Sequence, residues 1–159
     1  MLSDKMVAAI NGQINKEMYS AYLYMAMSAY ADGEGLKGFS TYFMVQYHEE
    51  MVHAMKFYEY LARQGNKIVL GAIQQPPSEF GTMLQMFEAT LEHEKFITRS
   101  INELVDLAYQ EKDYASKAFL DWYVTEQVEE ENNAVENIQK LKMIGDNSSA
   151  LYLLDKELG

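Results

Sequence analysis

The chain has 159 residues, 48% of them hydrophobic, which is enough for one globular domain with a substantial core. It contains no cysteine, and this excludes disulfides, thiolate-bound metal centres and thiol nucleophiles. The formal net charge of −11 argues against binding to nucleic acid or to anionic membranes. The sequence lacks both a secretory leader and the roughly 20 consecutive apolar residues of a membrane helix, so we expect a cytoplasmic protein.

The first half of the chain predicts two long helices, because its hydrophobic residues recur with the 3.6-residue period. The first predicted helix covers residues 3–31, and Ser3 is a suitable N-cap. The second predicted helix covers residues 36–63 and ends before Gly65.

The second half predicts two more long helices and a short one. The third predicted helix covers residues 79–110, after the chain's two prolines, and either Ser78 or Thr82 is a suitable cap. The fourth covers residues 114–144, and the short fifth covers residues 148–158. We expect the whole chain, residues 1–159, to form a single domain.

The connections between these helices predict their topology. The first and third connections are short, so the helices that they join are antiparallel neighbours. The second connection has about 15 residues and reaches about 50 Å when extended, whereas a helix of about 28 residues is about 42 Å long. The connection can therefore return along the bundle and make the second and third helices parallel. An all-α four-helix bundle with one long crossover is the ferritin-like topology.

Two glutamates lie in the middle of apolar helix faces. Glu17 shares its face with Ile10 and Ile14, and Glu94 shares its face with Ile97. A buried charge costs several kcal/mol unless it is paired or bound to a metal. A structural ion pair remains an alternative for either residue alone, but two such glutamates on different helices favour a metal site.

The second and fourth helices add ligands at the same level. Glu50 and His53 are three residues apart, so they share one helix face, as ligands of one metal do. Glu126 and Glu130 share a face of the fourth helix, and Gln127 lies beside Glu130. A solvated acidic face is the alternative for this last segment. One imidazole among many carboxylates suits iron or manganese better than zinc, copper or calcium.

The sequence resembles the non-haem ferritins of bacteria over essentially its whole length. The segments that carry the resemblance are Glu17-x6-Tyr24, the run from Glu49 to Lys56, His93-Glu94, the run from Trp122 to Glu131, and the C-terminal run from Leu154 to Gly159.

The resemblance implies three iron sites, and two to three iron ions per subunit. The first site would combine residues of the first two helices, namely Glu17, Glu50 and His53. The second would use Glu94 and Glu130, and Gln127 would lie nearby. Glu50 would bridge the two sites. The third would use the acidic residues Glu49, Glu126, Glu129 and Glu130.

The resemblance also implies the activity. Two close Fe²⁺ ions would be oxidised by O₂ or peroxide, and ferric oxide would be stored in a hollow shell of 24 subunits whose four-fold axes are lined by the fifth helix. Tyr24 would lie beside the first site as an electron donor, with a core tyrosine bonded to a carboxylate as the alternative. Val52 stands where a haem-ligating methionine would be expected, so we expect no haem.

Two other functions remain open at this point. The first is a different di-iron enzyme on the same bundle, such as a peroxidase or oxygenase, which would turn over without depositing mineral. The second is a non-catalytic helical interaction module, in which the acidic residues would have no role in iron oxidation. The fifth helix and the carboxylates of the third site favour the storage protein.

Overall fold

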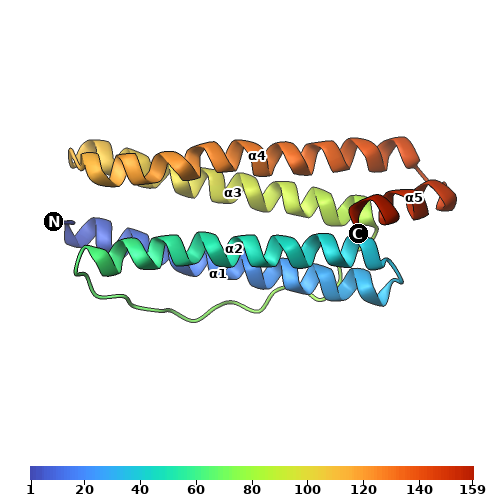
Figure 1. Cartoon of the computed structure of the whole chain (residues 1–159), viewed down its shortest axis with the longest axis horizontal. Coiled ribbons are helices and arrows are strands. Elements are labelled where there is room, and N and C mark those ends of the chain that lie inside the picture. Colours follow the sequence, from blue (N-terminus) through green and yellow to red (C-terminus); the bar gives the residue numbers. More distant parts are fainter.

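Five helices make up most of the computed structural model, which describes all 159 residues (Figure 1). Four long helices form a bundle and a short one closes one end of it. Their bounds are α1 Asp4–Gly33, α2 Lys37–Arg63, α3 Met83–Gln110, α4 Tyr114–Ile144 and α5 Ser148–Leu158. The predicted all-α bundle with a long crossover and a short fifth helix is therefore confirmed.

Side-chain caps mark the start of every helix except α2. The Ser3 hydroxyl accepts a hydrogen bond from the Met6 backbone N–H at 3.0 Å and so starts α1. The hydroxyl of Thr82 and the side chain of Gln85 exchange hydrogen bonds with each other's backbone N–H groups, which is a capping box. This box makes Thr82 the cap of α3, and the helix begins later than residue 79, where the sequence predicted it.

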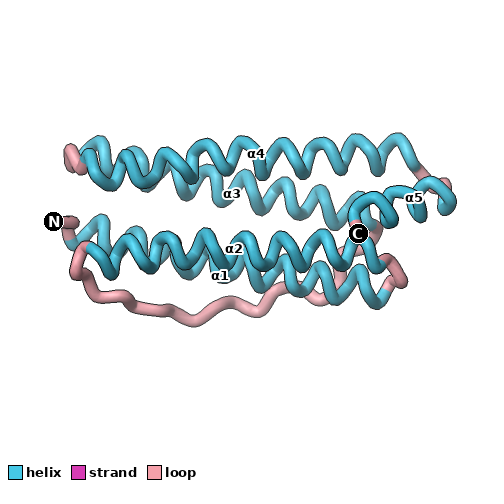
Figure 2. The backbone as a smooth tube through the Cα atoms, viewed as in Figure 1, coloured by secondary structure: helices cyan, strands magenta, loops and turns pink.

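The long crossover runs back along the bundle beside α1 (Figure 2). Two asparagines of α1 hold its backbone: Asn11 accepts a hydrogen bond from Val69 N–H at 2.8 Å, and Asn15 donates one to the Ala72 carbonyl at 3.0 Å. These bonds satisfy backbone groups of a segment that has no secondary structure of its own. Because the crossover returns to the end where α2 began, α2 and α3 run parallel (Figure 1).

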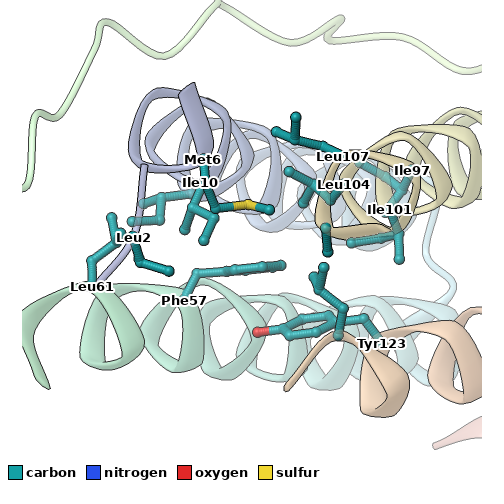
Figure 3. Close-up of a cluster of buried hydrophobic side chains, with 13 residues drawn as sticks. Leu2, Met6, Ile10, Phe57, Leu61, Ile97, Ile101, Leu104, Leu107 and Tyr123 are labelled. Atoms are coloured by element: carbon teal, nitrogen blue, oxygen red, sulfur yellow. The ribbon is translucent and has the colours of Figure 1, made fainter. Parts of the chain in front are cut away.

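Two apolar clusters fill the two ends of the bundle. The first contains 13 buried residues, and in Figure 3 side chains of α1 and α3, among them Met6 and Leu104, point toward Phe57 of α2. The second contains 12 buried residues around Phe43 and Phe87. The helices thus turn an apolar face inward, and none of them combines the length and the apolar character that a membrane crossing requires. Between the two clusters lies a layer of buried polar side chains.

Candidate metal centre

The polar layer contains residues from all four long helices. Its members share deep burial, each no more than 6% exposed, and they are Glu17 of α1, Glu50 and His53 of α2, Glu94 of α3, and Gln127 and Glu130 of α4. Because each residue sits near the middle of its helix, the four helices bring them to one level of the bundle.

Two sets of three ligands share one glutamate. The first set is Glu17, Glu50 and His53, and the second is Glu50, Glu94 and Glu130. Within each set the ligand atoms all lie within 4.8 Å of one another. The Nδ1 atom of His53 lies 3.1 Å from Glu50 Oε2 and 3.9 Å from Glu17 Oε2. The arrangement suits two metal ions with the Glu50 carboxylate between them.

Two ligand atoms have no hydrogen-bond partner. The Oε2 atom of Glu17 and the Nδ1 atom of His53 are buried and make no hydrogen bond. Such orphaned atoms are rare in folded proteins, because an unpaired buried polar group is costly. Burial, with a further contribution from Lys56, lowers the pKa of His53 to about 4, so its ring is neutral at pH 7. A neutral imidazole is the form that binds metals.

The carboxylates of the centre hold protons unusually tightly. Burial raises the pKa of Glu17 to about 7, and burial together with the charge of Glu94 raises the pKa of Glu130 to about 9. The pKa of Glu50 is raised well above its ordinary value by burial and by repulsion from Glu94 and Glu17. The buried residues include no lysine or arginine that would compensate for these acids, and bound metal ions would supply positive charge there.

Neighbouring side chains hold the carboxylate of Glu94 from both sides. The Tyr24 hydroxyl donates a hydrogen bond to Oε1, and the Gln127 amide nitrogen donates one to Oε2 at 3.0 Å. Burial and the charge of Glu94 raise the pKa of Tyr24 well above its ordinary value, so the phenol is neutral. Gln127 therefore faces Glu94 with its amide nitrogen.

Three of the four acidic residues expected at a third site lie outside this layer, on α2 and α4, whereas the fourth, Glu130, lies within it. Glu126 is partly exposed, and its Oε1 atom lies 3.8 Å from His53 Nε2. Glu126, His53 and Glu130 form a further set of three ligands within 4.8 Å. Glu49 and Glu129 are exposed and join none of the three sets. Burial raises the pKa of Glu49, and repulsion from Glu126 and Glu129 raises it further, so the acids are neighbours.

A comparison with protein families identifies the family to which this fold belongs. The Ferritin family, described as a ferritin-like domain, matches residues 7–144. The chain belongs to the ferritin family. It is 43% identical over 159 residues to a probable bacterial non-heme ferritin-like protein of Haemophilus influenzae, with 100% of this chain and 96% of the relative covered. It is 42% identical over 159 residues to a bacterial non-heme ferritin of Staphylococcus aureus, with the same coverage.

Solved ferritin structures have nearly the same backbone. An open pore ferritin from the hyperthermophilic archaeon Archaeoglobus fulgidus is 51% identical and superposes with a TM-score of 0.98. The superposition covers 99% of this chain and 98% of that one. An engineered closed form of that ferritin also superposes with a TM-score of 0.98 at 51% identity, over 99% of this chain and 96% of that one.

Some residues around the centre of this ferritin were not predicted from the sequence. Gln13 donates a hydrogen bond to Glu17 Oε1 at 3.0 Å, and Thr98 accepts one from Gln127 at 3.2 Å. Gln13 lies one turn before Glu17 on the same face, so a polar residue in an apolar stripe was the available signal. Thr98 gave no comparable signal, because its contact with Gln127 joins two helices.

Proposed function

We propose that this ferritin oxidises Fe²⁺ at a di-iron centre and stores the ferric product as a hydrated oxide inside a hollow shell. The observation that carries the proposal is the pair of buried three-ligand sets that share Glu50. Carboxylate-rich ligand sets with one imidazole suit iron, and they stabilise Fe³⁺ over Fe²⁺ because they supply negative charge. Membership of the ferritin family supports the same function.

The proposed roles of the ligands follow from their grouping. Glu17 and His53 would bind the first Fe²⁺, and Glu94 and Glu130 would bind the second. Glu50 would bridge the two ions. Each Fe²⁺ would give one electron to the oxidant. O₂ would take up these two electrons and two protons and become hydrogen peroxide, whereas peroxide would become water.

The residues around the ligands would support this reaction. Gln127 would orient Glu94, since its amide nitrogen donates to that carboxylate. Tyr24 would act as an additional electron donor, because its hydroxyl hydrogen-bonds to the same ligand. The protons that the acids hold near pH 7 would leave as Fe²⁺ binds, since a metal ligand must be deprotonated.

A third iron would bind on the α2–α4 side of the centre, at Glu49, Glu126, Glu129 and Glu130. Burial raises the pKa of Glu49 and of Glu126, and the charge of Glu129 raises both further, which is a condition that a cation relieves. Each subunit would therefore take up two to three iron ions.

The store itself would be a shell of 24 subunits, with α5 around the four-fold axes. Two residues of α5, Tyr152 and Leu153, and Met143 near the end of α4 are exposed apolar side chains in the single chain. Neighbouring subunits would cover them in the shell. Electron microscopy of the iron-loaded protein, which we expect to show closed hollow particles with a dense core, tests this assembly.

One pair of variants tests the centre. Glu94→Gln removes a ligand charge within the buried layer, and Glu92→Gln removes an exposed charge two residues away on the same helix. We expect Glu94→Gln to lower the initial rate of Fe²⁺ oxidation at least about tenfold, since losing one carboxylate ligand costs more than the 1.4 kcal/mol that a factor of ten represents. Glu92→Gln should match the wild type.

Anaerobic titration with Fe²⁺ and crystallography of the titrated protein complete the test. We expect two or three ions per subunit at the named residues. If Glu94→Gln oxidised Fe²⁺ as fast as Glu92→Gln, the proposed centre would be wrong. If wild-type protein oxidised iron without accumulating mineral, a di-iron enzyme would replace the storage protein.

A further inference from the structure

A chain of hydrogen bonds links the metal centre to a surface groove between α1 and α3. Its central member is Gln13, which is only 1% exposed. The Gln13 amide nitrogen donates to Glu17 Oε1 at 3.0 Å, and the Gln13 amide oxygen accepts from the Ser100 hydroxyl at 2.6 Å. The Ser100 hydroxyl in turn accepts from the Lys16 ammonium group at 2.8 Å. We call these three residues, Gln13, Ser100 and Lys16, the relay.

The lysine at its outer end gives the relay one direction. An ammonium group can only donate hydrogen bonds, so the Ser100 oxygen must accept from Lys16. The single hydroxyl hydrogen of Ser100 is then free to donate to the Gln13 oxygen. This in turn leaves the amide nitrogen of Gln13 to face Glu17. Lys16 and Ser100 therefore hold the Gln13 amide in the same orientation that the carboxylate of Glu17 favours.

The direction of the relay matters for the ligand. An amide nitrogen on Oε1 stabilises the ionised carboxylate of Glu17, whereas an amide oxygen in that place would repel it or require a proton between them. With Oε1 held in this way, Oε2 remains without a partner and lies 3.9 Å from His53 Nδ1. Gln13 thus sets which oxygen of Glu17 is presented to the centre.

The relay has polar surroundings at both of its ends. The groove has a volume of about 480 Å³ and is lined by Lys16, Ser100 and Gln13, with Glu103 and Asp106 at its acidic edge. On the other side of Gln13 lies the buried layer of ligands. The relay therefore reaches from solvent to a metal ligand through side chains alone.

We propose that Gln13 is a positioning residue for Glu17, and that Ser100 and Lys16 fix the orientation of its amide. The inference rests on the proposed function, because it assigns the relay to the first iron site. Partners of this kind, which hold a ligand from behind, change metal affinity about 10-fold to 100-fold when they are removed.

The first test uses the serine. Ser100→Ala breaks the relay without touching a ligand, and Ser100→Thr restores the hydroxyl. Ser28→Ala is a matched control, since Ser28 is also buried and loses a hydrogen bond to the Ser40 carbonyl, but it lies outside the relay. We expect Ser100→Ala to weaken anaerobic Fe²⁺ binding at the first iron site about tenfold or more, as measured by calorimetry. Ser100→Thr and Ser28→Ala should bind Fe²⁺ with an affinity close to that of the wild type.

The second test asks whether Lys16→Met tightens or weakens the binding of Fe²⁺. Lys16 is a cation near the centre, so if it acted through its charge alone, Lys16→Met would tighten Fe²⁺ binding. The relay predicts the opposite, because the variant loses the donor that orients Ser100 and Gln13. We also expect the double variant with Ser100→Ala to bind no more weakly than Ser100→Ala alone, since both changes break one chain.

Three results would overturn the inference. The first is wild-type affinity in Ser100→Ala, and the second is tighter binding in Lys16→Met. The third is equal weakening in Ser28→Ala, which would indicate a general loss of packing. A wild-type protein that bound no Fe²⁺ would instead overturn the proposed function, and with it the assignment of the relay.

Discussion

Glu50 shows the conflict between stability and function at a single residue. It is 2% exposed and belongs to two of the three-ligand sets, and its pKa is raised by burial and by the charges of Glu94 and Glu17. A carboxylate in this position favours two bound cations and disfavours the metal-free fold. The same side chain therefore supports the centre and destabilises the empty chain.

We predict that Glu50→Gln separates these two effects. The neutral amide has almost the same shape and cannot ionise, so the metal-free variant should unfold with a higher free energy than the wild type at about pH 8. Urea unfolding after treatment with a chelator measures this. Iron oxidation by the same variant should fall, because the bridging ligand is gone. A metal-free variant less stable than wild type would contradict the account.

The pattern of residues was sufficient to single out the acids and the histidine of the buried layer, but not the hydrogen bonds that surround them. Glu17 and Glu94 stood out because each interrupts an apolar stripe, and Glu50 and His53 because they share a face. The relay could not be predicted, since Ser100 and Gln13 are 87 residues apart and meet only when α3 packs on α1. Spacing along one helix shows which residues share a face, whereas contacts between helices depend on packing.

At the scale of an element, α5 depends on one close approach to α2. A Cβ atom on Gly38 would lie 1.6 Å from the backbone oxygen of Asp155, a distance that no side chain tolerates. The side chain of Asp155 also accepts a hydrogen bond from Phe39 N–H at 2.9 Å. Glycine at this point therefore allows α5 to lie against the start of α2. The sequence predicted α5 but not this contact, because the two segments lie at opposite ends of the chain.

We predict that Gly38→Ala displaces α5 from the bundle. The added methyl group meets backbone, so the two helices must separate, and the amide protons of α5 should lose protection from hydrogen exchange. Gly12→Ala is the matched control, since Gly12 also lies within a helix but nothing comes within 4 Å of the added atom. The control should be about 0.5–1 kcal/mol more stable than wild type, because alanine favours helix more than glycine. Unchanged protection of α5 in Gly38→Ala would contradict the prediction.

On the scale of the whole molecule, the buried centre couples folding to pH through groups that act in opposite directions. His53 and His93 each have a pKa lowered to about 4 by burial, compared with 6.5 in an unfolded chain. Between these values the unfolded chain binds more protons, so their effect is to raise stability as pH rises. Glu17 and Glu130 have raised pKa values, so over the same range they act in the other direction. Above about pH 6.5 the histidines no longer contribute, and the carboxylates alone decide the trend.

We predict that the metal-free protein loses stability as pH rises from about 6.5 to about 9. In this window the folded chain still holds protons on Glu17 and Glu130, whose pKa values are about 7 and about 9, while the unfolded chain has lost them near 4.5. The free energy of unfolding should therefore fall by about 1.4 kcal/mol per pH unit for each excess proton. Urea unfolding of chelator-treated protein at several pH values measures this slope.

Two comparisons connect this slope to the centre. Glu130→Gln should show a smaller slope, because the variant has one proton fewer to lose. Bound Co²⁺, which is not oxidised by O₂ under these conditions, should abolish the fall, since the ligands are then ionised in the folded state at every pH in the window. A metal-free stability that stayed level or rose with pH would mean that the acids of the centre are ionised without a cation. The centre would then have no need of metal to balance its charge, and the raised pKa values of Glu17 and Glu130 would be wrong.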